Sequence, residues 1–228
     1  MKNIIIYTTN DEIVSLKLLD KILSEIEFKK FKFDIIVTNS SFFRKLKVLI
    51  VFLFFGSIND LVTRFKNKIS LEELLSKHKN CKIVKNVDKK YDFGLNVYGI
   101  DKLKTQKFKI YNFHLGSLKN QRGSFIFFYK FLYNWNTIDL TFHEVTEKYD
   151  VGKILNKRTV SLQINENATK ICFLYLENLD FLIESINKIE DNIYIEYKDY
   201  NKLNLVPTFF NLLNLIIRIF FRRIFGSL

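Results

Sequence analysis

Cysteine, proline, glycine and alanine are all scarce in this chain. Its 228 residues include two cysteines, one proline, seven glycines and one alanine. Cys81 and Cys172 lie far apart and without a cluster of metal-ligating neighbours, so neither a disulfide framework nor a zinc site of the usual kind is expected. The sequence therefore indicates a reducing, cytoplasmic setting. With 48% apolar and 26% charged residues, the composition is that of a globular protein and excludes disorder and a collagen-like repeat.

Long hydrophobic runs are missing as well. The amino-terminal run Ile4–Tyr7 is too short for the core of a signal peptide. The longest uninterrupted run, Val48–Phe55, has eight residues, whereas a membrane helix needs about 20. The sequence therefore predicts no leader and no membrane span, and the basic, apolar segment 44–65 is expected to be a buried or interfacial helix.

Acidic residues are outnumbered by basic ones. The chain has 36 Lys and Arg against 24 Asp and Glu, a formal net charge of +12. Such a charge favours acidic partners, for example phosphates, nucleic acid or an anionic lipid surface. Its sign alone does not choose among them.

Short apolar runs alternate with amphipathic segments along most of the chain. Helices are expected over 13–26, after the capping box of Ser70 and Glu73, over 124–135 and, as one long helix, over 168–189. This alternation predicts an α/β fold: a doubly wound, mostly parallel, Rossmann-like sheet with helices on both faces and a helical carboxy-terminal extension. In such sheets ligands bind at the carboxyl ends of strands. Strands are predicted over 4–7, 33–38, 81–84, 93–97, 109–113, 139–145 and 153–162.

Polar residues that can carry chemistry lie at the ends of two predicted strands. Asn112 and His114 lie two residues apart, and the period of a strand puts them on the same face. His143 is followed seven residues later by Asp150, which begins Asp150-Val151-Gly152. A lone Asn-x-His pair is more often structural, and Asp-x-Gly is an ordinary turn. The third histidine, His78, has charged neighbours and no predicted role.

Taken together, these residues resemble the catalytic core of the folate-dependent formyltransferases. That family has a signature close to N-x-H-P-S-L-L-P-x-x-R-G, then T-x-H at the end of a strand, then D-x-G-x-I-L. The likeness covers about 92–162, and Leu115 and Lys119 stand where the family usually has proline. From the sequence as a whole we expect a catalytic domain over 1–165, a helical part of that domain over 166–206 and an amphipathic basic helix over 207–228. The matching residues here are Asn112-x-His114, Arg122-Gly123, His143-Glu144-Val145 and Asp150-Val151-Gly152-Lys153-Ile154-Leu155.

The resemblance implies a role for each polar residue. Asn112 is expected to donate a hydrogen bond to the oxyanion of a tetrahedral intermediate, and His114 to act as general acid and base. Asp150 is expected to orient His114 and to hold a water that relays protons. His143 is similar to a supporting histidine of the family, with packing in the core or the folate pocket as the alternative.

The formyl donor implied is 10-formyltetrahydrofolate, with no metal. Its pterin is expected to bind the backbone of Val97, Tyr98, Gly99 and Ile100, beside His143 and the loop before Asp150, although Tyr98 is equally well explained as core. Substrate binding is expected from Thr8, Thr9 and Asn10 at the end of the first strand, and from Arg122.

Elimination indicates which amine is formylated. About 65 residues follow Leu162, too few and too helical for the extra barrel domain of a methionyl-tRNA formyltransferase. The first strand leads into Thr8-Thr9-Asn10, without the glycine-rich phosphate loop expected of an enzyme that formylates glycinamide ribonucleotide. The best fit is a sugar-nucleotide N-formyltransferase, acting on a dTDP- or GDP-linked amino-deoxysugar for a surface polysaccharide of the O-antigen or lipopolysaccharide type. The stretch 102–130, with seven Lys or Arg and no acid, fits a diphosphate substrate and equally a solvated basic surface.

Two other functions remain open. The charge is compatible with a formyltransferase for methionyl-tRNA or another amine, although the best fit predicts no nucleic-acid partner. Because a fold alone does not establish activity, the other alternative is an inactive binding protein with the formyltransferase fold. The intact Asn112, His114 and Asp150 count against it.

The carboxy-terminal segment 208–225 predicts an unusually apolar helix. Its polar residues recur on one narrow face, and its charges are three arginines with no acid. Such a helix fits the interface of an anionic membrane, on the inner face if the protein is cytoplasmic. The alternatives are packing on the core or on the second subunit of a homodimer. The polar positions are Asn211, Asn214, Arg218 and Arg222.

Overall fold

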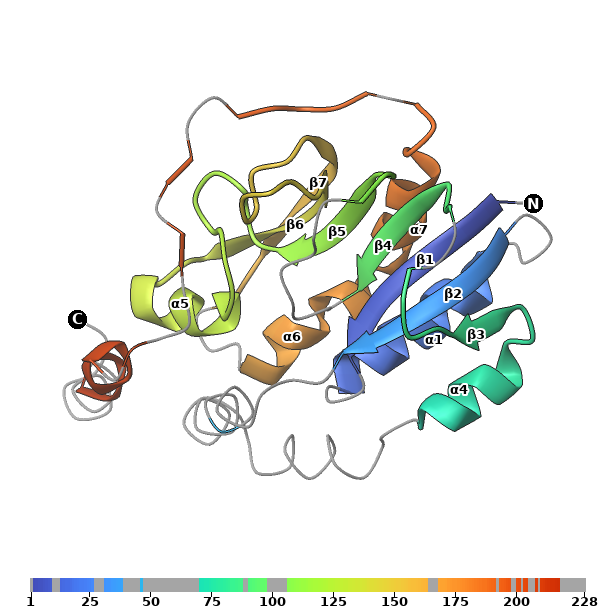
Figure 1. Cartoon of the computed structure of the whole chain (residues 1–228). Helices are drawn as coiled ribbons and strands as arrows, with labels where there is room; N and C mark the ends of the chain where they lie inside the picture. Colours follow the sequence, from blue (N-terminus) through green and yellow to red (C-terminus); the bar gives the residue numbers. More distant parts are fainter. Residues whose placement is uncertain are drawn as a thin grey trace.

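A computed structural model describes most of the chain (Figure 1). The described residues are 2–9, 13–26, 31–38, 46, 70–87, 90–97, 106–163, 168–191, 193–197, 200–201, 203–204, 208 and 210–217. The helix predicted over 44–65 lies outside them, except for Leu46. The elements are β1 (Lys2–Thr9), α1 (Ile13–Glu25), β2 (Phe31–Thr38), α4 (Leu71–Lys77), β3 (Cys81–Ile83), β4 (Phe93–Val97), β5 (Ile110–Leu115), α5 (Ile126–Tyr133), β6 (Thr137–Glu144), β7 (Ile154–Ser161), α6 (Ala168–Glu177) and α7 (Leu179–Asn187).

Seven strands form one mostly parallel sheet, as the sequence predicts. Their order is β3-β2-β1-β4-β5-β6-β7. The pairs from β3 to β5 are parallel, and β6 and β7 complete the sheet antiparallel. The chain moves outward from β1 in one direction through β2 and β3 and in the other through β4 and β5. The carboxyl ends of β1 and β4 therefore border the switch point where open α/β sheets bind ligands.

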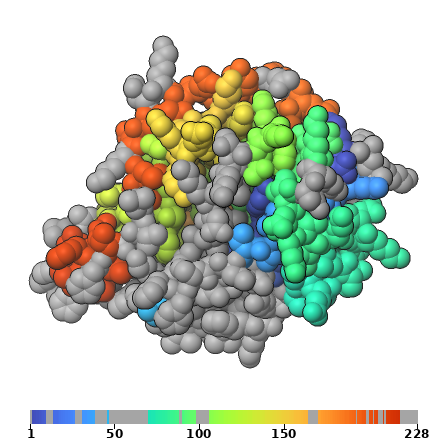
Figure 2. All heavy atoms as spheres, viewed as in Figure 1, coloured from blue at the N-terminus to red at the C-terminus, as the bar shows by residue number. Residues whose placement is uncertain are grey.

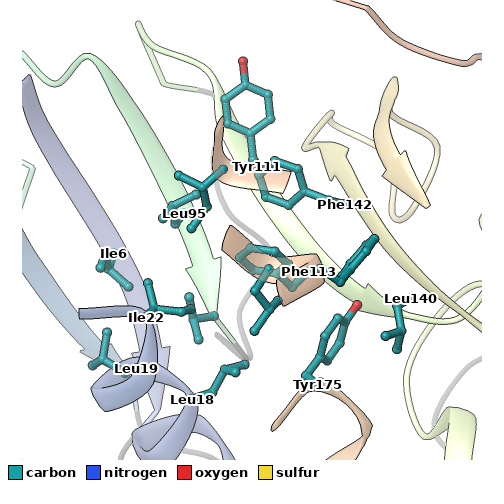
Figure 3. Close-up of a cluster of buried hydrophobic side chains, with 14 of the residues drawn as sticks. Ile6, Leu18, Leu19, Ile22, Leu95, Tyr111, Phe113, Leu140, Phe142 and Tyr175 are labelled. Carbon is teal, nitrogen blue, oxygen red and sulfur yellow. The ribbon is translucent and has the colours of Figure 1, made fainter. Parts of the chain in front are cut away.

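The main core lies between one face of the sheet and α1, α6 and α7. Alternate residues of β1, β2, β4, β5 and β6 enter this core, for example Ile4 and Ile6 of β1. The rings of Phe113 and Phe142 lie 4.6 Å apart, and Tyr175 of α6 contacts Phe113 edge-on at 6.0 Å (Figure 3). Burying one such ring stabilises the fold by about 1.5–3 kcal/mol, so this cluster fixes β5 and β6 against each other. Their alternate residues are thereby fixed on the opposite face.

The long helix predicted over 168–189 is wrong, because the structure has two helices there. They are separated at Asn178, whose backbone is not helical (φ −126°, ψ 51°). The side-chain amide of Asn178 donates to the carbonyl of Leu174 at 2.8 Å. Asparagine side chains compete in this way with backbone hydrogen bonds, which explains the break. It lets α7 turn Phe181 and Leu182 fully into the core.

The predicted capping box at the start of α4 is confirmed for its serine, since Ser70 Oγ accepts from the N–H of Glu73 at 3.0 Å. At the other end of this helix His78 is only 7% exposed, despite its charged neighbours. A nitrogen of its imidazole lies 2.8 Å from the carboxylate of Asp20 on α1. His78 therefore ties α4 to α1.

The carboxy-terminal helix, described over 210–217, packs on α5 at the edge of the molecule (Figure 2). Leu215 is 2% exposed and lies in a cluster with Phe128 and Leu132, so one side of the helix does pack on the core. Phe210, Leu213 and Ile217 remain 75%, 42% and 43% exposed. Within the described residues, no helix has the length and apolar character needed to cross a membrane.

Candidate active site

Strands β5 and β6 bring three of the predicted residues onto the face opposite the main core. Asn112 pairs with His143, and His114 pairs with Thr141. The sequence predicts a strand that ends at residue 113, just before His114. In the structure β5 extends to Leu115, so His114 lies within the strand. The alternation that buries Phe113 in the core is the reason that Asn112 and His114 share the other face.

The imidazole of His114 is held through Nε2, which lies 2.8 Å from the carbonyl oxygen of Gln121. Because a carbonyl oxygen only accepts hydrogen bonds, Nε2 carries the hydrogen, and Nδ1 is the nitrogen that can take up or release a proton. Nδ1 faces Oδ1 of Asp150 at 3.7 Å. Gly116 makes this geometry possible, since its φ is 143° and a Cβ there would lie 2.3 Å from the Gln121 oxygen.

The loop that follows His114 is anchored by hydrogen bonds of Gln121 and Thr141. The side-chain oxygen of Gln121 accepts from the N–H of Ser117 at 3.0 Å, and its amide nitrogen donates to the carbonyl of Thr137 at 2.9 Å. Thr141 donates through Oγ1 to the carbonyl of Gly116 at 2.7 Å. The sequence did not indicate a role for Gln121, because its part in the site uses a backbone carbonyl that any residue carries.

The carboxylate of Asp150 lies between two imidazoles. Its Oδ1 is 3.7 Å from Nδ1 of His114 and 3.6 Å from Nε2 of His143, while Oδ2 accepts from the N–H of Gly123 at 2.7 Å. Asp150 has a left-handed backbone (φ 50°), a conformation that aspartate and asparagine tolerate better than most residues. The predicted group of Asn112, His114 and Asp150 is thus brought together on the face of the sheet opposite the main core.

Arg122 holds the loop that carries Asp150. Its guanidinium donates to the carbonyls of Asp150 at 3.0 Å, Tyr149 at 2.8 Å and Asn201 at 2.8 Å. The guanidinium also lies over the ring of Tyr200 at 5.3 Å. Substrate binding by Arg122 stays a prediction, and the described contacts commit its nitrogens to backbone carbonyls.

The segment around Asn204 completes this arrangement from the far end of the chain. Asn204 donates from its N–H to the carbonyl of Arg122 at 2.9 Å, and its carbonyl accepts from Ser124 at 3.0 Å. Tyr200 donates from its hydroxyl to the carbonyl of Val151 at 3.0 Å. The described parts of the connection between α7 and the carboxy-terminal helix run from one side of the molecule to the other (Figure 1), and Tyr200, Asn201 and Asn204 contact the site loops on the way.

His143 is 1% exposed and its ring is fixed on both sides. Nδ1 lies 2.9 Å from the backbone carbonyl of Glu144, so Nδ1 donates, and Nε2 accepts from the side-chain amide of Asn112 at 3.1 Å. Burial lowers the pKa of His143 to about 4, although the carboxylate of Asp150 opposes the shift. His143 is therefore neutral near pH 7, with its hydrogen on Nδ1. Its contact with folate stays a prediction.

This lowered pKa predicts a pH dependence of stability. Between pH 6.5 and about pH 4 the unfolded chain protonates His143 while the folded chain does not, so the free energy of unfolding falls as the pH falls. Urea unfolding at pH 7 and pH 5 measures this loss. In His143→Asn, which keeps a donor for the Glu144 carbonyl, the loss is expected to be smaller. An equal loss in both proteins would contradict the assignment.

Gly152 gives a second prediction, because its position leaves no room for a side chain. A Cβ there would lie 1.5 Å from the carbonyl oxygen of Glu144 and 3.3 Å from Nδ1 of His143. Gly152→Ala is expected to displace the Asp150 loop and to destabilise the fold, which thermal unfolding would measure. Val151→Ala in the same loop is the control. A melting temperature unchanged by Gly152→Ala would contradict the close contact between Gly152 and the carbonyl of Glu144.

Asn96 of β4 belongs to the same row of polar residues, although no motif in the sequence marks it. Its side-chain nitrogen donates to Oδ1 of Asn112 at 2.8 Å. The available signal was its position near the end of a predicted strand, next to the strand of Asn112. Its own Oδ1 and the hydroxyl of Tyr7 are buried without a hydrogen-bond partner in the described structure.

The remaining predicted residues lie around this row. Thr8 and Thr9 end β1 and are fully buried, and the side chain of Val97 lies in the main core. Binding of substrate or pterin by these three residues stays a prediction. Asn10, Tyr98, Gly99 and Ile100 lie outside the described residues.

The basic stretch 102–130 does not form one free surface where it is described. Lys109 lies 3.6 Å from the carboxylate of Glu144, and Lys130 is 4% exposed and donates to the carbonyl of Gln163 at 3.4 Å. Lys119 is exposed, at the start of the loop that Arg122 continues. The described part of this stretch thus has several separate structural roles.

Comparison with known proteins identifies the fold. No protein-family model matches the sequence, and no curated protein matches it. The N-formyltransferase from Helicobacter canadensis, in complex with folinic acid and dTDP-3-aminofucose, is 19% identical over 98% of this chain and 82% of its own, with a TM-score of 0.61. WlaRD, a sugar 3N-formyltransferase in the presence of dTDP and 5-N-formyl-THF, is 20% identical over 98% and 81%, with a TM-score of 0.60. HypX from Aquifex aeolicus is 12% identical, with a TM-score of 0.51, and this chain spans only 30% of its length.

The class defined by these likenesses is the α/β formyltransferase fold, as the sequence indicates. Within that class, the fold is like that of the sugar N-formyltransferases over nearly the whole of this chain.

Proposed function

We propose that this chain is an N-formyltransferase that moves a formyl group from 10-formyltetrahydrofolate to the amine of a nucleotide-linked amino-deoxysugar. The observation that carries the proposal is the convergence of Asn112, His114 and Asp150 on one face of a sheet with the formyltransferase fold. Two proteins of that fold contain a folate together with dTDP or a dTDP-sugar in their structures.

Asn112 supplies the donor for the oxyanion. Attack by an amine on the formyl carbon places negative charge on the formyl oxygen, and a fixed amide N–H lowers the energy of that charge. Asn112 uses one Nδ2 hydrogen for His143 and has a second to donate. A donor of this kind typically contributes about 10²–10³ in rate.

His114 and Asp150 move the protons. The attacking nitrogen must lose a proton as the new C–N bond forms, and the folate nitrogen must gain one as the old C–N bond breaks. Nδ1 of His114 takes and returns this proton, because Nε2 is committed to the Gln121 carbonyl. The distance of 3.7 Å from Nδ1 to Asp150 exceeds a hydrogen bond and suits a bridging water.

The folate donor would supply the formyl group, and the chain would supply the binding site for the folate. The backbone of 97–100, beside His143, is the proposed pterin site, and Thr8, Thr9 and Asn10 with Arg122 are the proposed binding residues for the sugar nucleotide. The product would serve a cytoplasmic step in the synthesis of a surface polysaccharide.

Mass spectrometry of the purified protein, incubated with 10-formyltetrahydrofolate and a panel of dTDP- and GDP-aminosugars, tests the proposal. A sugar nucleotide that gains one formyl group, and does not in Asn112→Ala, is the expected result. Folate binding without product would direct the search to another amine, such as a lipid-linked sugar or methionyl-tRNA. Absence of folate binding would overturn the proposal in favour of a binding protein.

We also propose that the carboxy-terminal helix rests on an anionic membrane surface. The helix turns Leu212 and Leu215 toward α5, which leaves the stripe of Phe210, Leu213 and Ile217 to solvent. The sequence from 208 onward carries three arginines and no acid, which favours anionic lipid as the occupant over a second copy of this basic chain.

Co-sedimentation with phosphatidylglycerol vesicles measures this binding. The intact protein is expected to sediment with these vesicles and not with phosphatidylcholine alone, and Phe210→Gln with Leu213→Gln and Ile217→Gln should remain in solution. Ile193→Gln, at a residue 76% exposed elsewhere, is the matched control. Failure to bind, with a concentration-dependent dimer by light scattering, would assign the stripe to a second subunit instead.

A further inference from the structure

One chain of hydrogen bonds crosses three neighbouring strands on the site face. It begins at the carbonyl of Glu144, which accepts from Nδ1 of His143 at 2.9 Å. Nε2 of His143 accepts from Nδ2 of Asn112 at 3.1 Å, and Oδ1 of Asn112 accepts from Nδ2 of Asn96 at 2.8 Å. Because the first acceptor is a backbone carbonyl, the direction of every later bond follows from it.

The chain admits one orientation of the Asn112 amide. If that amide were turned over, its oxygen would face the lone pair of His143 Nε2 and its NH₂ would face the NH₂ of Asn96. Both contacts would be repulsive. His143 and Asn96 therefore hold the amide from its two ends, and one Nδ2 hydrogen of Asn112 has no partner among the described residues.

Asn96 does not improve the packing of this face. Its own Oδ1 is buried without a hydrogen-bond partner in the described structure, which costs stability that an apolar side chain of similar size would not cost. On the side away from Asn112, Asn96 pairs with Tyr7, and the next positions on this face are Ile5, Gly94 and Ile110. An asparagine in these surroundings is explained by what its nitrogen donates to.

We propose that Asn96 is a positioning residue, which fixes the side-chain amide of Asn112 so that its second Nδ2 hydrogen is directed at the reacting oxygen. This inference rests on the proposed formyl transfer for its effect on turnover. Its structural part, the orientation of Asn112 by Asn96, can be measured without any turnover.

Two variants separate donation from space-filling. Asn96→Leu removes the donor, and Asn96→Asp keeps the shape but places an acceptor opposite Oδ1 of Asn112. Both are expected to lower kcat, by about 10–100-fold, with little change in KM for either substrate, since a misdirected group costs up to about 10²-fold. At pH 8 Asn96→Asp is expected to have the lower kcat of the two variants, because its carboxylate favours the inverted orientation of the Asn112 amide. A side chain that only fills space would give Asp nearly the activity of Asn.

Nitrogen NMR of the His143 imidazole reports the orientation of the Asn112 side-chain amide, because it shows which ring nitrogen is protonated. In the intact protein His143 is expected to carry its hydrogen on Nδ1 and to stay neutral at pH 6. In both variants the Asn112 oxygen can turn toward Nε2 and accept from it, so protonation of Nε2 and a raised pKa of His143 are expected. A formyltransferase assay that fails with the intact protein leaves this measurement intact, so the two proposals fail separately.

Asn156→Leu is the matched control. Asn156 donates from its side-chain amide to Ser185 Oγ at 3.0 Å, on β7 and facing α7. Asn156→Leu should lower the melting temperature without changing kcat or the NMR spectrum of His143. Unchanged kcat and an unchanged His143 spectrum in Asn96→Leu, or equal effects from Asn156→Leu, would overturn the proposal.

Discussion

Replacing His114 by alanine is expected to lower kcat by about 10²–10⁴-fold, the range for a general acid and base. The variant removes Nδ1, the nitrogen that faces Asp150, and leaves the buried carbonyl of Gln121 without the donor it has from Nε2. An unsatisfied buried carbonyl costs about 1–3 kcal/mol, so a lower melting temperature is also expected. Single-turnover kinetics and thermal unfolding measure the two effects.

His78→Ala is the matched control for this experiment. His78 is also buried, and its imidazole lies 2.8 Å from the carboxylate of Asp20. It connects α4 to α1 and does not contact the candidate site in any described hydrogen bond. It should lose stability and keep its turnover. If His114→Ala retained near-normal turnover, the general acid and base would have to be another group.

Asp150→Asn is expected to have an effect of similar size, a fall in kcat of about 10²–10⁴-fold, because it removes the charge that orients and stabilises a protonated His114. Asparagine tolerates the left-handed backbone at this position and can still accept from the N–H of Gly123. The fold should therefore survive. The pKa of His143 should fall further, because the Asp150 carboxylate is the charge that raises it.

Asp139→Asn provides the comparison for removing a buried carboxylate. Asp139 is 8% exposed and accepts from Oγ1 of Thr159 at 2.7 Å, with Lys157 Nζ at 3.0 Å. This variant should be less stable and retain its turnover. If Asp150→Asn had the same turnover as the intact protein, the role of Asp150 would be limited to its hydrogen bond with the N–H of Gly123.

The sheet could be predicted from the sequence because its signal is local. Strand Phe93–Val97 has its predicted bounds, and both ends of each of the other six strands lie within two residues of the predicted ends. The break at Asn178 could not be predicted by periodicity, since apolar residues on both sides continue the helical pattern. One side-chain amide that bonds a backbone carbonyl decides it.

The site was predictable to the extent that it consists of side-chain types at fixed intervals. Asn112, His114 and Asp150 follow from such a pattern, and the structure has Nδ1 of His114 3.7 Å from Asp150 and Asn112 two residues before His114 in β5. Gln121 acts through its carbonyl and Asn96 through its place on a neighbouring strand, so neither leaves a pattern in the local sequence. Arg122 is the opposite case. The motif predicts that it binds substrate, whereas its described hydrogen bonds go to carbonyls of the loop that carries Asp150.

The bonds from Arg122 to Asn201, and from Asn204 back to Arg122, have a consequence for the order in which the protein matures. A ribosome releases the chain from its amino terminus, and domains begin to fold during synthesis. All seven strands emerge before residue 162, some forty residues ahead of the segment that fastens the Asp150 loop. The nascent chain therefore acquires its sheet early, and we expect the carboxylate of Asp150 to be held in place only after residues 201–204 have been synthesised.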